Sequence, residues 1–170
     1  MDVLNVVDAT VEVADDPCCS FLDLTVNSEP LRDQLGKDVV LDGCTPLRAG
    51  WPLRWGLEWL DLLLDSSGGE LPDRRVALFV CKECGDLGCG ALSVDIERVD
   101  SSVRWREFGW EDSSDERFES TGEPREFTFE AKAYDRMLQA IHERVLASRL
   151  EVPASGHLWW RKEGISLMAL

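Results

Sequence analysis

The chain has 170 residues, of which 44% are hydrophobic. This length suits one full hydrophobic core, so we expect residues 1–170 to form a single domain. The hydrophobic content excludes a mainly disordered protein. The 33 acidic residues outnumber the 18 basic ones, which gives a net charge of −15. A surface this acidic would repel phosphate groups, so we expect no binding to nucleic acid or to anionic membranes, and we expect a basic protein partner.

The sequence also indicates a cellular location. No apolar run approaches the length of about 18 residues that a membrane helix needs. The first residues lack the basic and apolar regions of a signal peptide. We therefore expect a cytoplasmic protein. In that compartment the six cysteines are expected to be reduced thiols or metal ligands rather than disulfides.

The first forty residues predict short elements. Residues 1–20 contain an interrupted apolar run, which predicts an edge strand or a loose arm, and residues 21–26 predict a strand. Ser28 and Pro30 have the positions of a helix cap and a first-turn proline. A short helix is therefore expected after them, ending at Gly36.

Residues 51–65 have the strongest helical pattern in the chain. Pro52 falls in the first turn, and glycines follow the end of the segment. At about 100° per residue the polar residues form one narrow stripe, so the helix should be covered on most sides. The stripe consists of Arg54, Glu58, Asp61 and Asp65.

Three tryptophans recur every four residues in the same segment. Trp51, Trp55 and Trp59 therefore share one face of the predicted helix. We interpret this face as part of the hydrophobic core. The alternative is an aromatic platform for a ligand.

The second half of the chain predicts strands followed by a helix. Alternating apolar residues in 76–80, 91–96 and 103–108 predict an antiparallel meander of three strands. Residues 127–129 return briefly to a strand pattern, and 131–147 have the apolar stripe of an amphipathic helix. The predicted fold is α+β, an antiparallel sheet of about five to six strands with the two main helices packed on it. Residues 151–170 form an apolar tail.

An acidic stretch separates the meander from the last predicted strand. Residues 111–126 contain many carboxylates and only two arginines, which predicts a solvated loop. The alternative is a surface for a basic partner, with charges that steer the partner and an aromatic residue that anchors it. The candidate residues for such a surface are Trp110, Glu111, Asp112, Asp115, Glu116 and Glu119.

Residues 80–90 join two of the predicted strands and contain three of the cysteines, with the spacing C-x2-C-x4-C. Cys81, Cys84 and Gly85 resemble a zinc knuckle, and Cys89 is a third candidate ligand. Structural zinc takes four ligands, and Cys44 is our first candidate for the fourth because it also lies in a turn. Weaker candidates are Asp86, His157, Cys18 and Cys19. A tight glycine turn with metal-free thiols is the alternative.

The sequence gives little support for an enzyme. A redox-active C-x-x-C should begin a helix, whose N-terminus lowers the pKa of the thiol. Here Gly85 and Asp86 follow, and they favour the end of a hairpin. No hydrolase, phosphate-binding or dinucleotide-binding motif occurs, so no catalytic residue is assigned.

The cysteine segment also carries a resemblance to known proteins. The pattern V-C-x-E-C-G-D-L-G-C-G-A at 80–91, followed by the V-x-W-x-x-F hairpin that begins at Val103, resembles a group of small, uncharacterised bacterial proteins. The similarity covers roughly residues 75–110, with a weaker echo in 127–134. The resemblance implies an intracellular protein with a compact α+β domain. Some members of the group are labelled oxidoreductases, and the resemblance transfers no catalytic residue.

Three functional hypotheses follow from the sequence. The leading one is a non-enzymatic, acidic interaction protein of the inhibitor or immunity type, which neutralises a basic partner. The second is a thiol- or metal-dependent oxidoreductase. The third is a regulatory domain in which a zinc knuckle has a purely structural role.

Overall fold

The structure is a computed structural model that describes residues 1–2, 4–9, 21–40, 43–48, 51–65, 68–69, 71–112, 118–122 and 124–150. It contains helices and antiparallel strands, which confirms the predicted α+β class. The expected tail at 151–170 and most of the expected arm at 1–20 lie outside the described residues.

The smaller of two sheets contains β1 (Leu4–Ala9), β2 (Phe21–Val26) and β3 (Glu29–Pro30). Between β2 and β3, Asn27 and Ser28 have φ angles of 55° and 67°, which are typical of a tight hairpin turn. The prediction of Ser28 as a helix cap was wrong, because this residue belongs to the turn. The short helix α1 (Leu31–Leu35) begins directly after Pro30 without a side-chain cap, and α2 (Lys37–Val40) follows it.

The larger sheet contains β4 (Val76–Phe79), β5 (Ala91–Val99), β6 (Ser102–Glu111), β7 (Glu119–Ser120) and β8 (Phe127–Glu130). The antiparallel order β4-β5-β6 is the meander that the sequence predicted. Both β7 and β8 pair with β6, the first near its end and the second near its start. The larger sheet has five antiparallel strands, as expected, and the smaller three-stranded sheet is an addition that the sequence did not predict.

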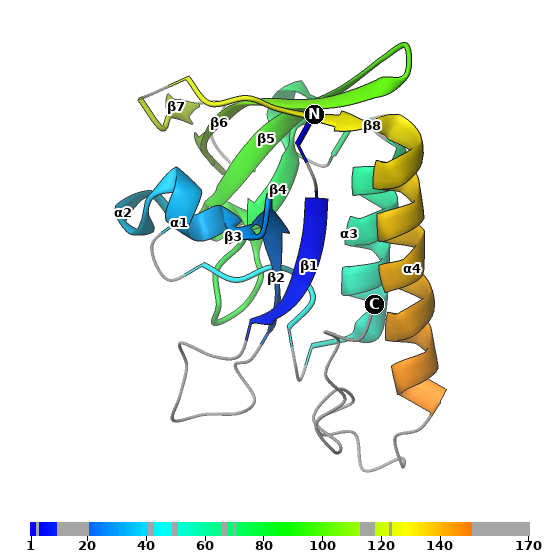
Figure 1. The fold of residues 1–170 in the computed structure, drawn as a ribbon. Coiled ribbons are helices and arrows are strands. Elements are labelled where there is room, and N and C mark those ends of the chain that lie inside the picture. Colours follow the sequence, from blue (N-terminus) through cyan, green and yellow to red (C-terminus); the bar gives the residue numbers. More distant parts are fainter. Residues whose placement is uncertain are drawn as a thin grey trace.

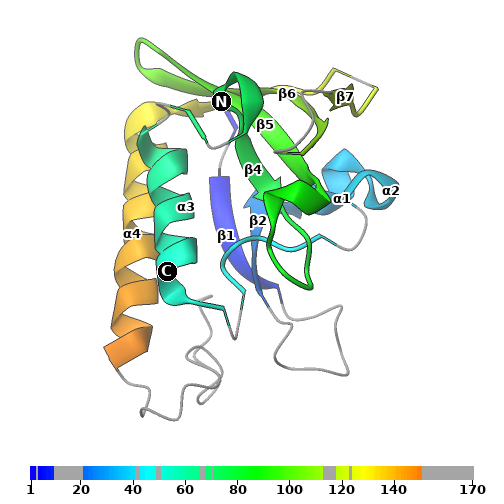
Figure 2. The ribbon, with the colours of Figure 1, turned by 180° about the vertical axis from the view of Figure 1, so that it is seen from behind.

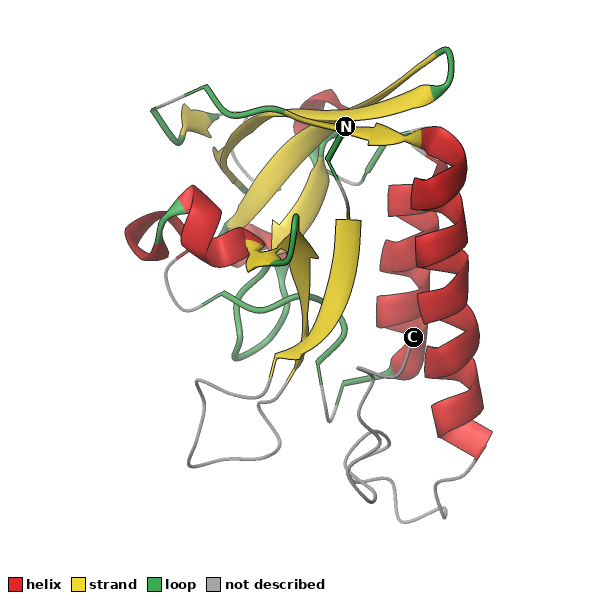
Figure 3. Ribbon diagram, viewed as in Figure 1, coloured by secondary structure: helices red, strands yellow, loops and turns green. Residues whose placement is uncertain are grey.

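The two main helices are α3 (Leu53–Asp65) and α4 (Ala131–Leu150), close to the predicted ranges. They lie side by side and antiparallel at one edge of the molecule, opposite α1 and α2 (Figures 1 and 2). The strands occupy the space between these two helical regions (Figure 3). Within the described part of the chain, no helix has both the length and the apolar character needed to cross a membrane.

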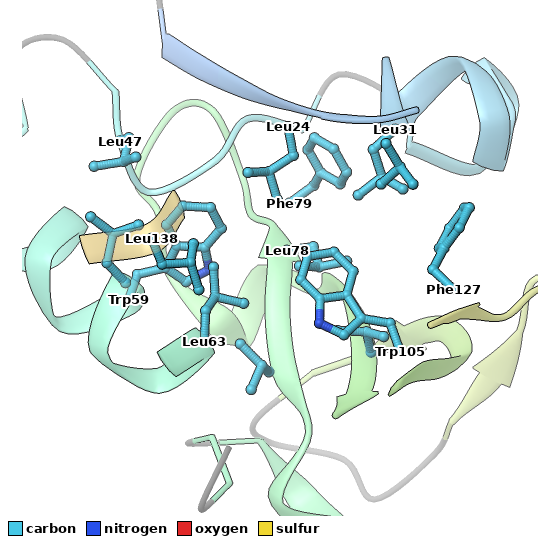
Figure 4. Close-up of a cluster of buried hydrophobic side chains, with 14 of the residues drawn as sticks. Leu24, Leu31, Leu47, Trp59, Leu63, Leu78, Phe79, Trp105, Phe127 and Leu138 are labelled. Carbon is cyan, nitrogen blue, oxygen red and sulfur yellow. The ribbon is translucent and has the colours of Figure 1, made fainter. Parts of the chain in front are cut away.

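The hydrophobic core joins both sheets to the two long helices. Leu24 of the smaller sheet, Leu78 of the larger sheet and Leu138 of α4 all contribute to it (Figure 4). Trp105 of β6 is fully buried, and its indole N–H donates to the Tyr134 hydroxyl at 3.2 Å. The Tyr134 hydroxyl donates in turn to the carbonyl of Leu63 at 2.9 Å. These two bonds connect β6, α4 and α3.

A separate contact fixes α3 against the larger sheet. Trp59 is buried, and its indole N–H donates to the carbonyl of Ala77 in β4 at 2.7 Å. Because β4 leads directly into the cysteine segment, this bond also places α3 beside that segment. The predicted tryptophan face therefore lies next to the candidate site.

Candidate metal centre

The cysteine segment begins directly after β4, where Val80 pairs with a residue from an earlier loop. Val80 and Cys44 exchange two backbone hydrogen bonds, at 2.9 and 3.1 Å. This antiparallel bridge fixes the direction in which the chain enters the turn. The turn then runs from Cys81 to Gly90, and β5 begins at Ala91. The sequence prediction of a bend between neighbouring strands agrees with this geometry.

Glycine and aspartate determine the shape of the turn. The N–H of Gly85 donates to the carbonyl of Cys81 at 2.8 Å, with Gly85 at a φ of +70°, a conformation that favours glycine. The Asp86 carboxylate accepts a hydrogen bond from the N–H of Gly88 at 2.7 Å. This bond caps a single turn of 3-10 helix, Leu87–Cys89, which returns the chain toward β5. Cys84 therefore lies in the turn and does not begin a helix.

The turn brings three thiols together. The sulfur atoms of Cys81, Cys84 and Cys89 all lie within 4.8 Å of one another, and those of Cys84 and Cys89 are 3.6 Å apart. A tetrahedral zinc ion with Zn–S bonds of about 2.3 Å holds its sulfur ligands about 3.8 Å apart. The three thiols are thus close enough to hold a metal ion.

Hydrogen bonds to sulfur favour thiolate at one of these positions. Backbone N–H groups of Cys84 and Glu83 lower the pKa of the Cys81 thiol, and the N–H of Asp86 donates to the Cys84 sulfur at 3.4 Å. The neighbouring Cys84 sulfur has the opposite effect on Cys89, whose pKa it raises to about 11. Three thiolates this close repel one another, so a bound cation would favour the ionisation of all three.

The structure places the predicted fourth ligand elsewhere. Cys44 is 1% exposed and lies in the core beside Val80, whereas Cys84 and Cys89 are exposed. Among the described residues, the group of converging metal-ligating side chains consists of Cys81, Cys84 and Cys89 alone. The weaker candidate Asp86 caps the turn instead. The remaining candidates Cys18, Cys19 and His157 lie outside the described residues.

The predicted partner-binding residues do not form one loop surface. Glu111 ends β6 and is 6% exposed, with its carboxylate 3.2 Å from the Arg75 guanidinium. The expectation that Glu111 faces solvent is corrected, because this ion pair is buried. Trp110 is partly buried, and its indole N–H donates to the carbonyl of Val39 at 2.6 Å.

The other members of that surface have different environments. Asp112 is partly buried, and Glu119 is exposed in β7, where it pairs with Trp110 of β6. Asp115 and Glu116 lie outside the described residues. A short strand therefore interrupts the region predicted as the acidic loop 111–126.

The structure shows a cleft that the sequence did not predict. It has a volume of about 400 Å³ and lies between α3 and the cysteine turn. The cleft lining includes Trp51, Trp55, Glu58, Cys84 and Asp86. The four-residue spacing of the tryptophans was the only sequence signal for it. Trp59 packs in the core as predicted and lines the cleft together with Trp51 and Trp55. The alternative interpretation, an aromatic platform for a ligand, stays a prediction.

Comparisons with known proteins leave the family open. No protein-family model matches the chain, and searches of curated proteins and of solved structures likewise found no match. The resemblance of the cysteine motif to the group of bacterial proteins therefore stays a prediction. Function has to be inferred from the geometry of the site.

Proposed function

We propose that this protein binds a zinc ion through Cys81, Cys84 and Cys89. The observation that carries the proposal is the approach of the three sulfur atoms to within 4.8 Å of one another. Thiolates are soft ligands that select zinc over the hard cations magnesium and calcium. The backbone N–H groups directed at Cys81 and Cys84 would also stabilise thiolate ligands.

The proposed role of the ion is structural. It would join the two ends of the turn, because Cys81 follows β4 and Cys89 precedes β5. Three thiolates leave one position of a tetrahedral ion for a further ligand. We do not assign that position to Cys44, whose sulfur is not in the group.

Metal content tests the zinc proposal. The full chain, purified under reducing conditions without chelator, should contain about one zinc per molecule. Cys84→Ser should lose the metal, and Cys44→Ala should keep it as the matched control. Wild-type protein that contains no metal and shows no thiolate charge-transfer absorption with Co²⁺ would contradict the proposal.

We also propose, as a second function, that the protein is an acidic interaction protein for a basic partner, of the inhibitor or immunity type. Its support is the net charge of −15 together with exposed carboxylates on α3, at Glu58, Asp61 and Asp65. Opposite charges accelerate association in a way that salt suppresses. Association with a basic protein should slow steeply as salt rises, and salt-independent association would count against this function.

A thiol-dependent oxidoreductase is the alternative to a metal site. Its support is the distance of 3.6 Å between the sulfur atoms of Cys84 and Cys89. Two sulfur atoms this close need to move little to form a disulfide when the thiols are oxidised. Metal content and thiol oxidation, measured on the same purified protein, distinguish the oxidoreductase from the metal site. A metal-free chain in which these two thiols oxidise and reduce reversibly would favour the oxidoreductase, whereas zinc that protects the thiols from oxidation favours the metal site.

A further inference from the structure

We propose that the cleft between α3 and the cysteine turn binds an arginine or lysine side chain of the basic partner. This inference rests on the second proposed function and specifies where that partner docks. The cleft volume of about 400 Å³ falls in the range of sites that enclose a small ligand or a few side-chain groups. Two kinds of group that attract an organic cation, aromatic rings and carboxylates, meet in this cleft.

The aromatic part comes from Trp55 in the N-terminal half of α3 and from Trp51, which precedes the helix. Trp55 is 38% exposed, so its ring is accessible to a ligand from solvent. Its ring lies 5.8 Å from that of Trp51, in an edge-to-face arrangement. Tryptophan faces attract guanidinium and ammonium groups more strongly than other aromatic rings. The chain itself uses one ring in this way, because the guanidinium of Arg48 lies 4.9 Å from the centre of the Trp51 ring.

The charge of the cleft is negative on two sides. Glu58 extends from α3, and Asp86 lies in the cysteine turn on the opposite wall. Cys84 also lines the cleft. A Zn²⁺ ion held by three thiolates carries a net charge of −1, so the metallated turn would add to the attraction for a cation. Lys82 is the basic residue of this turn, and it is not among the residues that line the cleft.

The floor of the cleft suits the aliphatic part of such a side chain. The cleft lining also includes Trp59, Leu62, Leu71 and Val80. Trp59, Leu71 and Val80 are buried, whereas Glu58 and Asp86 are exposed. Arginine and lysine carry a stem of methylene groups that packs on apolar surface while the charged end stays in a polar environment. An apolar floor with a rim of tryptophans and carboxylates therefore matches both parts of a basic side chain.

Calorimetric titration of the full, metal-containing chain with a short arginine- and lysine-rich peptide tests this inference. Trp55→Ala should weaken binding by about three- to thirtyfold, because a cation–π contact is lost. Glu58→Gln should weaken it by about two- to fivefold. Glu143→Gln is the matched control, since it removes the same charge from an exposed position on α4 away from the cleft, and it should bind like wild type.

The outcomes separate this inference from the function on which it rests. Salt-dependent peptide binding that is equal in wild type, Trp55→Ala and Glu58→Gln overturns the cleft as the docking site and leaves the interaction function in place. No binding of the peptide by wild type overturns both. Methylguanidinium that binds as tightly as the peptide shows a site for a free small cation and overturns the assignment to a partner protein. Metal content reports on the zinc proposal independently.

Discussion

Gly85 is the residue on which the shape of the cysteine turn depends most directly. Its φ of +70° lies in the left-handed region, and a Cβ atom there would stand 3.0 Å from the Trp51 ring. Gly85→Ala should therefore lower the free energy of unfolding by about 1–2 kcal/mol from backbone strain, and by more if Trp51 cannot shift. It should also weaken zinc binding, because the three thiols move apart. Chemical denaturation and a zinc competition assay measure the two effects.

Gly122 provides the control for this substitution. Its φ is +95°, and a Cβ atom there would meet no atom within 4 Å. Gly122→Ala should carry only the backbone cost and leave zinc affinity unchanged. Equal zinc affinity in both variants would show that the geometry of the turn does not determine metal binding.

A second prediction at the residue scale concerns the buried carboxylate of Asp23. It accepts hydrogen bonds from Arg32 and from the N–H of Leu24, each at 2.9 Å. Burial nevertheless raises its pKa above the usual range, and the attraction of Arg32 opposes that effect only in part. The folded state thus holds this proton more tightly than the unfolded state. The resulting stability is fully present below the unfolded pKa and is lost as the pH rises through the folded pKa.

Asp23→Asn measures this contribution, because asparagine does not titrate. The free energy of unfolding of wild type minus that of the variant should decrease as the pH rises from the unfolded pKa toward neutrality, and then level off. Urea denaturation across this pH range gives the difference. A difference that increases with pH would mean that Arg32 outweighs burial and lowers the pKa.

Individual site residues were only partly predictable from the sequence. The spacing of Cys81, Cys84 and Cys89 was sufficient for the thiol cluster, because all three lie within one short turn whose glycines are visible in the sequence. Cys44 is different, since its distance from the turn depends on a tertiary backbone bridge to Val80. Spacing along the chain carries no information about where such a bridge directs the side chain.

At the scale of elements, the metal is expected to stabilise one segment and not the whole chain. Cys81, Cys84 and Cys89 lie between β4 and β5, and the proposed ion would cross-link this turn. Removal of zinc by a chelator should speed amide hydrogen exchange in residues 81–90. Exchange in α4, which is distant in the fold, should change little. Hydrogen exchange measured by mass spectrometry reports both regions, and an equal change in both would argue against a local role for the metal.

The elements themselves were predictable where the pattern is local. Apolar periodicity identified α3, α4 and the β4-β5-β6 meander, because each repeats over many residues. The division into two sheets was not predictable in this way, since β8 pairs with β6 and β2 pairs with β1 through contacts between separate segments. The cleft was missed for the same reason, because Glu58 and Asp86 lie on different elements.

For the whole molecule, the hydrogen bonds of Tyr134 connect the sheet to both long helices. Its hydroxyl accepts from Trp105 and donates to Leu63, and the side chain is fully buried. Tyr134→Phe would leave a buried indole N–H and a buried carbonyl without this partner. The free energy of unfolding should fall by about 1–3 kcal/mol, with cooperative unfolding retained and zinc content unchanged. A loss of zinc in this variant would show that the metal site depends on the whole core.

The cleft brings acidic side chains together with the candidate metal site, because Cys84, a proposed zinc ligand, forms part of one wall. X-ray absorption at the zinc edge of the purified full chain tests the metal site most directly. Wild type should show sulfur neighbours at about 2.3 Å, with one sulfur fewer in Cys89→Ser and no change in Cys44→Ala. A coordination shell of nitrogen and oxygen atoms only, or a sulfur count that Cys89→Ser does not alter, would contradict zinc binding by the cysteine turn.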